Sequence, residues 1–182
     1  MCGIVGILGT KPVAIDLVDA LRRLEYRGYD SAGVATIENG QLDRRRAEGK
    51  LRNLEVRLSN QPLQGVTGIG HTRWATHGGP TDRNAHPHLS SDGKLALIHN
   101  GIIENFADLK QELLDDGATF LSETDTEVAA HLVARSFAET GDLTEAMRLV
   151  VDRLHGAFTL LIMHEDRPGI VVGARRNSPL VI

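Results

Sequence analysis

The sequence predicts an α+β layered sandwich. Short apolar runs rich in β-branched residues lie near both ends of the 182-residue chain, and most segments with helical spacing lie between them. That distribution favours separate sheets covered by helices over a regular alternation of strands and helices. We find no internal repeat, low-complexity tract or linker in the sequence. One domain with a single layered core is therefore expected.

The chain is predicted to begin with a buried strand over residues 2–8, an apolar run with spaced glycines. A helix is expected next, with Thr10 as its N-cap and Gly28 at its end. The apolar positions that repeat at helical spacing within it are Val13, Leu17, Leu21 and Leu24.

A hairpin is expected to follow, because Asn39-Gly40 is a strong signal for a two-residue turn. Its second strand contains Arg44-Arg45-Arg46, a run without interleaved aromatic residues that favours a solvated edge strand over a nucleic-acid site. The predicted ranges are 32–37 and 41–47 for the hairpin strands, 50–58 for a short helix, and 66–76 for a strand that runs into a loop.

The second half is expected to open with a long loop over residues 77–93, which is rich in Gly, Pro, Asn, Asp and Ser. Long loops inside compact domains are often functional. The elements predicted after it are a strand over 95–99, helices over 103–114, 125–139 and 143–154, and a pair of strands over 157–164 and 170–175.

Composition excludes several classes of protein. The chain has 41% hydrophobic and 24% charged residues, as in ordinary globular proteins, and its net charge of −4 argues against nucleic-acid binding. A single cysteine cannot form an internal disulfide, and the apolar run near the N-terminus is too short for a signal peptide or a membrane span. We therefore expect a cytoplasmic protein without a membrane partner.

The only cysteine is Cys2, and its position has two explanations. If Met1 is removed, Cys2 carries a thiol and a free α-amine on one residue, and the amine can serve as the base that activates the nucleophile. Its ordinary pKa of about 7.7–8.0 suits that role near neutral pH. Alternatively, Cys2 is a small apolar residue at the start of a buried strand. Position alone leaves both open.

Three further stretches each have a functional and a structural interpretation. Arg73, in His71–Gly78, suits the capture of a carboxylate, although a surface arginine is the commoner case. Asn100-Gly101 offers an amide and a backbone N–H as an oxyanion hole, or a plain turn. Asp125 follows Thr124 in a capping-box pattern, where an acidic residue is expected in any case, and could also bind an ammonium group.

Taken together, six motifs resemble the glutaminase domains of the glutamine–fructose-6-phosphate aminotransferases, a branch of the class II glutamine amidotransferases. The resemblance covers the whole chain in order. The motifs are Cys2–Gly6, Tyr26–Gly33, His71–Gly78, Asn84–His88, His99–Asn105 and Ser122–Glu127.

The resemblance implies an N-terminal-nucleophile fold, in which two antiparallel sheets form an α/β/β/α sandwich. It implies that Cys2 attacks the side-chain amide of L-glutamine and that Asn100 and the Gly101 N–H hold the oxyanion. Arg73 would bind the α-carboxylate of the substrate and Asp125 its α-ammonium. Thr76 and His77 would line the pocket, Trp74 would lie over it, and His86 would face the sugar-phosphate half. No metal or organic cofactor is implied.

The resemblance also implies a longer, homo-oligomeric enzyme with a sugar isomerase region. On that basis residues 1–182 are expected to be a glutaminase domain, truncated near its C-terminal end and without the isomerase region. Two rival functions stay open. The histidines of His86-Pro87-His88, with His71 and His77, could bind a metal, although their spacing is not that of zinc hydrolases. The chain could also be a non-enzymatic ligand-binding domain.

Overall fold

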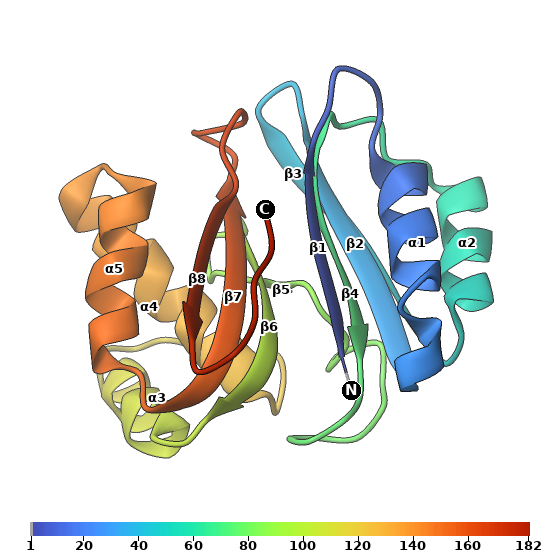
Figure 1. The fold of residues 1–182 in the computed structure, drawn as a ribbon. Coiled ribbons are helices and arrows are strands. Elements are labelled where there is room, and N and C mark those ends of the chain that lie inside the picture. Colours follow the sequence, from blue (N-terminus) through green and yellow to red (C-terminus); the bar gives the residue numbers. More distant parts are fainter. Residues whose placement is uncertain (1) are drawn as a thin grey trace.

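The structure, a computed structural model that describes residues 2–182, consists of four layers. Figure 1 shows two sheets facing each other, with α1 and α2 covering the outer face of one and α3, α4 and α5 covering the outer face of the other. The predicted α/β/β/α sandwich with two antiparallel sheets is therefore confirmed. Met1, on whose removal the proposed free amine of Cys2 depends, lies outside the described residues.

The first sheet has the strand order β1-β4-β2-β3, and all its pairs are antiparallel. The predicted hairpin joins β2 to β3, and both turn residues, Asn39 and Gly40, have positive φ angles of 51° and 74°. That is the conformation a two-residue hairpin turn requires. The strands are β1 (Gly3–Leu8), β2 (Ser31–Glu38), β3 (Gln41–Glu48) and β4 (Thr67–Arg73).

The helices over this sheet are α1 (Ala14–Arg22) and α2 (Leu51–Asn60), with a short 3₁₀ turn over Glu25–Arg27. Thr10 is not the N-cap of α1: the helix begins at Ala14, and no side chain caps it. The backbone N–H of Val13 instead donates to the carbonyl of Gly65 at 3.0 Å, so a tertiary contact takes the place of the cap.

In the second sheet the order is β5-β6-β7-β8, again antiparallel throughout. The strand predicted to stop at His99 continues through Asn100-Gly101 to Ile103, because every residue of it pairs with a residue of β7. The expected long loop also contains a two-residue strand. The strands are β5 (His88–Leu89), β6 (Leu95–Ile103), β7 (Gly156–His164) and β8 (Val172–Arg176).

The second sheet is covered by α3, α4 and α5. The Thr124 hydroxyl caps α4 by accepting from Glu127 N, as the capping-box pattern predicts. The Glu127 carboxylate does not complete the box, because it accepts from the backbone N–H groups of Leu121 and Ser122. The helices are α3 (Phe106–Asp115), α4 (Asp125–Thr140) and α5 (Leu143–Arg153).

Three apolar layers hold the sandwich together. One lies between the first sheet and α1 and α2, and another between the second sheet and α3, α4 and α5. The layer between the two sheets fixes how they face each other. Its buried members are Ala35, Ile37, Ile69, Ala96, Ile98, Leu161 and Met163.

The arginine run of β3 is only partly as predicted. β3 is an edge strand, as expected. However, Arg44 and Arg46 are half-buried and donate to the carbonyls of Pro87 and Ala85, so their side chains are not fully solvated. Among residues 2–182, no helix is long and apolar enough to cross a membrane.

Candidate active site

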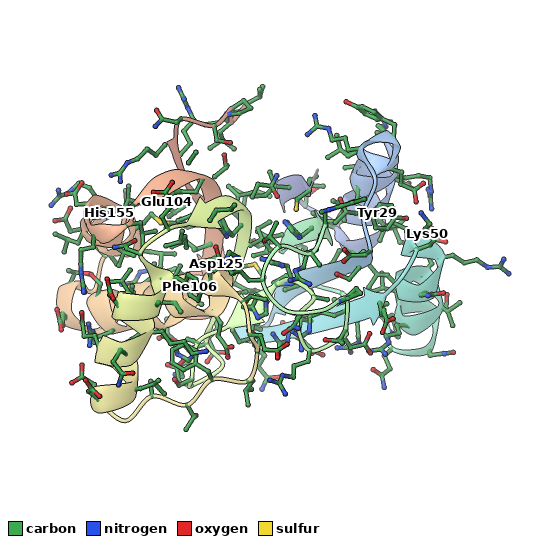
Figure 2. The ribbon with its side chains drawn as sticks, turned by 90° about the horizontal axis from the view of Figure 1, so that it is seen from below. Tyr29, Lys50, Glu104, Phe106, Asp125 and His155 are labelled. Atoms are coloured by element: carbon green, nitrogen blue, oxygen red, sulfur yellow. The ribbon has the colours of Figure 1, made fainter. Side chains whose placement is uncertain are left out.

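The predicted site residues come from both sheets and meet at the end of the sandwich where the N-terminus lies (Figure 1). Cys2 immediately precedes β1, Arg73 ends β4, Asn100 lies in β6 and Asp125 opens α4. Figure 2 looks at this end from below and shows Asp125 and Phe106 on the side of α3 and α4. The fold therefore brings together residues that are far apart in the sequence.

The Cys2 thiol is held by the backbone of Trp74. The Trp74 N–H donates to Sγ at 3.2 Å, and Sγ lies 3.8 Å from the Trp74 carbonyl oxygen. Burial raises the pKa of this thiol above its ordinary value, although the Trp74 N–H acts in the opposite direction. The thiol is therefore protonated at neutral pH, and a nucleophilic attack needs a base that removes its proton.

Asn100 points its amide nitrogen at Cys2. Nδ2 lies 3.3 Å from the Cys2 carbonyl oxygen, and Oδ1 lies 2.8 Å from Nε2 of His71. A carbonyl only accepts, so the atom facing Cys2 is the NH₂ group, and Oδ1 must accept from His71. Burial lowers the pKa of His71 to about 3, so its ring is neutral and carries its single proton on Nε2. His71 thus fixes which end of the amide faces Cys2.

Gly101, the second predicted oxyanion donor, has a backbone that only glycine tolerates. Its φ is 124°, and a Cβ at this position would lie 2.1 Å from the carbonyl oxygen of Ala157. The Asn-Gly pair is therefore not a turn but the part of β6 nearest the site. The role of the Gly101 N–H stays a prediction.

Arg73 is buried, with 3% of its surface exposed. Its guanidinium donates to the carbonyls of Gly78 and Gly79, each at 3.1 Å, and to that of His77. Burial lowers its pKa, while the carboxylates of Asp30 and Asp125 favour its charged form. In this structure Arg73 therefore organises the loop that begins after β4.

That loop carries the other predicted pocket residues. Trp74 is 54% exposed and packs against Gly28, where a Cβ would lie 3.0 Å from the indole. Thr76 is exposed. The His77 ring makes an edge contact with Phe106 at 4.8 Å between centroids, and its Nδ1 lies 3.9 Å from Oδ1 of Asp125. The structure brings His77 and Asp125 together, and the pocket roles of Trp74 and Thr76 stay predictions.

Asp125 is 3% exposed and lies in the first turn of α4. Its Oδ2 accepts from the backbone N–H of Ile103 at 2.9 Å. Its Oδ1 has no such backbone partner among the described residues, and two imidazole nitrogens stand near it, those of His77 at 3.9 Å and His99 at 3.8 Å. Oδ2 thus anchors the side chain to β6, and Oδ1, which accepts from the Thr126 hydroxyl at 3.5 Å, can take a cation as a further partner.

A group of buried histidines lies behind the site. The sequence offered His71, His86 and His88 only as alternative metal ligands, and His86 also as a residue facing the sugar-phosphate half. The rings of His71 and His86 stack at 4.1 Å, and Nε2 of His86 lies 2.8 Å from the Thr126 hydroxyl, which is also 3.1 Å from Nδ1 of His99. Burial lowers the pKa of His86, His88 and His99 as well. The buried rings are therefore neutral.

Asp30 was also missed, although it lies within a motif that carries the resemblance. Its Oδ2 accepts from the Ala75 N–H at 2.6 Å, and its backbone N–H donates to the carbonyl of Arg73 at 2.7 Å. It therefore holds the segment that supplies the Trp74 contacts to Cys2. The position of this carboxylate within the Tyr26–Gly33 motif was the signal available in the sequence.

In the described part of the chain, no group of three or more His, Cys, Asp or Glu side chains is arranged to hold a metal ion.

Comparison with known proteins decides the family. The family model described as a glutamine amidotransferase domain matches residues 57–177. The chain belongs to the glutamine amidotransferase family. Over its full length this amidotransferase domain is 61% identical to glutamine–fructose-6-phosphate aminotransferase (isomerizing) of Streptomyces coelicolor and 62% identical to that of Mesorhizobium japonicum. It spans 30% of the length of each relative.

Solved structures agree with this assignment. The glutamine phosphoribosylpyrophosphate amidotransferase of B. subtilis superposes with a TM-score of 0.75 at 30% identity, over 91% of this amidotransferase domain and 35% of that chain. A structure described as the allosteric regulatory enzyme of purine biosynthesis gives 0.72 at 32% identity, over 90% and 35% of the two chains. The predicted N-terminal-nucleophile fold is therefore confirmed.

Proposed function

We propose that this domain hydrolyses the side-chain amide of L-glutamine through a thioester on Cys2. The observation that carries the proposal is the placement of the Asn100 amide, whose Nδ2 faces Cys2 at 3.3 Å from its carbonyl while His71 fixes Oδ1 on the opposite side. A donor held rigidly beside a nucleophile is what stabilises a tetrahedral oxyanion.

In the proposed reaction the α-amine of Cys2 takes the thiol proton as Sγ attacks the amide carbon. The C–O π electrons move to oxygen, and the oxyanion is held by Asn100 Nδ2 and the Gly101 N–H. The intermediate collapses when the C–N bond breaks, and the amine returns its proton to the leaving ammonia. Water then adds to the thioester carbon, the C–S bond breaks, and glutamate and the Cys2 thiol are restored.

The surroundings of the thiol support the amine as base. The hydrogen-bond partners of Sγ among the described residues are backbone groups of Trp74, and no imidazole nitrogen is among them. The nearby His71 already uses Nε2 on Asn100 and is neutral. A base on Cys2 itself fits these surroundings, and a terminal amine has a suitable pKa.

Glutamine is proposed to lie between the two halves of the site, with its α-ammonium at Oδ1 of Asp125 and its α-carboxylate at Arg73. Thr76 and His77 would line the pocket and Trp74 would cover it. We further propose that this chain is the glutaminase domain of a longer protein. There its ammonia would convert fructose 6-phosphate to glucosamine 6-phosphate on a sugar isomerase region. The relatives' name, glutamine–fructose-6-phosphate aminotransferase (isomerizing), supports fructose 6-phosphate as the acceptor.

The test is the release of glutamate and ammonia from L-glutamine by the purified chain and by Cys2→Ala. The wild type is expected to produce both in equal amounts and the variant neither. A sensor domain would instead bind glutamine without producing glutamate. Activity that survives in Cys2→Ala would refute the proposed nucleophile.

A further inference from the structure

A pocket of about 260 Å³ lies where the edge strands of the two sheets, β3 and β5, meet the start of α4. It is separate from Cys2 and Asn100, neither of which lines it. Three arginines line it, Arg44 and Arg46 from β3 and Arg83 from the long loop. The arginine run thus has a side that the proposed reaction does not use.

The guanidinium groups of these arginines donate to backbone carbonyls and not to carboxylates. Arg44 donates to the Pro87 carbonyl at 2.7 Å, and Arg46 donates to the carbonyls of Ala85 and Arg83 at 2.8 and 3.1 Å. Across residues 2–182, neither these two side chains nor that of Arg83 forms an ion pair within 4.0 Å. Arg45, which lies between Arg44 and Arg46 in the sequence, does form an ion pair, with Asp43 at 2.6 Å.

The two carboxylates that line the pocket are engaged elsewhere. Glu127 accepts from Leu121 N at 2.8 Å and from both the backbone N–H and the hydroxyl of Ser122 at 2.6 Å. Asp92 accepts from the Ser90 hydroxyl at 2.5 Å and from Lys94 N at 3.1 Å. Neither carboxylate therefore neutralises the arginines by direct contact.

The positive charges of Arg44 and Arg46 repel each other, although the Glu127 carboxylate favours the charged form of both. Burial lowers the pKa of Arg44, and burial together with the neighbouring charge of Arg44 lowers that of Arg46 to about 10. The pKa of His88 falls well below its ordinary value because of burial first and the charge of Arg46 second. A bound anion would relieve this repulsion.

Two further polar side chains belong to the lining. The Ser91 hydroxyl lies 2.8 Å from Nδ1 of His131, and both residues line the pocket. His131 is 5% exposed, and its Nε2 lies 3.7 Å from Oε1 of Glu127, beyond hydrogen-bond distance. Three guanidinium groups, a hydroxyl and an imidazole that share one pocket can together supply the donors that a polar anion needs.

We propose that this pocket binds a phosphate group, either as the free ion or as the head of a small phosphomonoester. Arg44 and Arg46 lie on the same face of β3, about 6.6 Å apart along the strand, and His131 faces them from α4. Donors that approach from several directions suit a tetrahedral dianion better than a planar carboxylate. The proposal is independent of glutamine hydrolysis.

The test is a titration of the ¹⁵N-labelled chain in a phosphate-free buffer, with sodium chloride used to hold ionic strength constant. Inorganic phosphate and glycerol 3-phosphate are added in separate arms, and amide shifts and calorimetric heats are followed. We expect saturable shifts at residues 88–93. Stronger binding of inorganic phosphate assigns the free ion, and stronger binding of glycerol 3-phosphate assigns a phosphomonoester.

The variants make the test specific. Arg44→Gln with Arg46→Gln is expected to weaken binding at least tenfold, since hydrogen bonds to charged groups are worth about 1.5–3 kcal/mol. Arg83→Gln changes an exposed side chain, so it tests the same charge cluster without a cost in folding. It is expected to weaken binding about threefold. Arg45→Gln is the matched control from the same strand and should bind like the wild type.

The proposal is overturned if neither anion gives saturable shifts at residues 88–93. It is equally overturned if Arg45→Gln weakens binding as much as Arg83→Gln does. None of these readouts uses glutamine or Cys2, so a failure here would leave the proposed hydrolysis standing, and an inactive chain could still show the anion site.

Discussion

Replacing His71 with leucine tests whether one hydrogen bond holds the Asn100 amide in its catalytic orientation. The variant removes the donor that lies 2.8 Å from Oδ1 and leaves that buried oxygen without a partner. An unsatisfied buried acceptor costs roughly 1–3 kcal/mol, and the amide can recover part of that by turning Oδ1 elsewhere. If about 1.4 kcal/mol of this appears in the transition state, kcat falls about tenfold.

The effect should appear in kcat and not in KM, because the amide is needed when charge develops on the oxygen. The upper limit of the loss in kcat is set by Asn100→Ala, which removes the amide donor entirely and should lower kcat by about 10²–10³-fold. His71→Gln is the rescuing variant, because its amide nitrogen can reach the same acceptor. We expect it to recover most of the lost kcat.

The assay is steady-state glutamate release, with circular dichroism at the assay temperature to confirm folding. His164→Leu is the matched control, since His164 is also a buried strand histidine but lies beside Phe137 and Asp166, remote from Cys2. In the double variant, His71→Leu should cost nothing further once Asn100 is alanine. A normal kcat in His71→Leu, or additive losses in the double variant, would refute the reasoning.

Three further outcomes are expected. Asp125→Asn keeps an acceptor for Ile103 N but removes the charge proposed to bind the α-ammonium, so KM for glutamine should rise roughly 30-fold, which corresponds to about 2 kcal/mol; an unchanged KM would contradict that role. Arg73→Ala should also raise KM for glutamine, because the loss of its contacts weakens substrate binding by about 2–4 kcal/mol. Amide exchange in the loop over residues 77–79 should become faster, since Arg73 no longer holds the loop carbonyls. An unchanged kcat/KM would contradict the placement of Arg73 in the site. The pKa values of four buried histidines, His71, His86, His88 and His99, are lowered in the folded state. The unfolded chain therefore binds more protons below about pH 6.5, and the free energy of unfolding should fall by up to about 1.4 kcal/mol per histidine for each pH unit below that value. Equal urea midpoints at pH 7.5 and pH 5.5 would contradict this.

Local patterns in the sequence predicted most elements because their periodicity follows directly from which face is buried. Val13, Leu17 and Leu21 are buried at the predicted helical spacing, and the Asn39-Gly40 turn joins the strands expected of it. The errors come from tertiary contacts that a local pattern does not contain. Thr10 failed as a cap because Gly65 supplies the acceptor from elsewhere in the chain.

The same contrast between local pattern and tertiary contact applies to the candidate site. Asn100-Gly101 has a strong local preference for a turn, yet nine residues of β7 pair with β6 and keep the pair extended. The inward direction of Arg44 and Arg46 depends on the loop carbonyls that they meet, and the tautomer of His71 depends on Asn100. The sequence alone therefore indicates which residues belong to the site but not which neighbour orients each one.

The central claim is that Cys2 supplies both the nucleophile and the base. The most direct measurement compares glutamate release from protein whose first residue is Cys2 with release from protein that retains a residue ahead of it. The blocked form keeps the thiol, but its amine has become an amide without useful basicity. We predict activity at background in the blocked form, with both forms equally folded by circular dichroism. Full activity in the blocked form would contradict the account, because another group would then be the base.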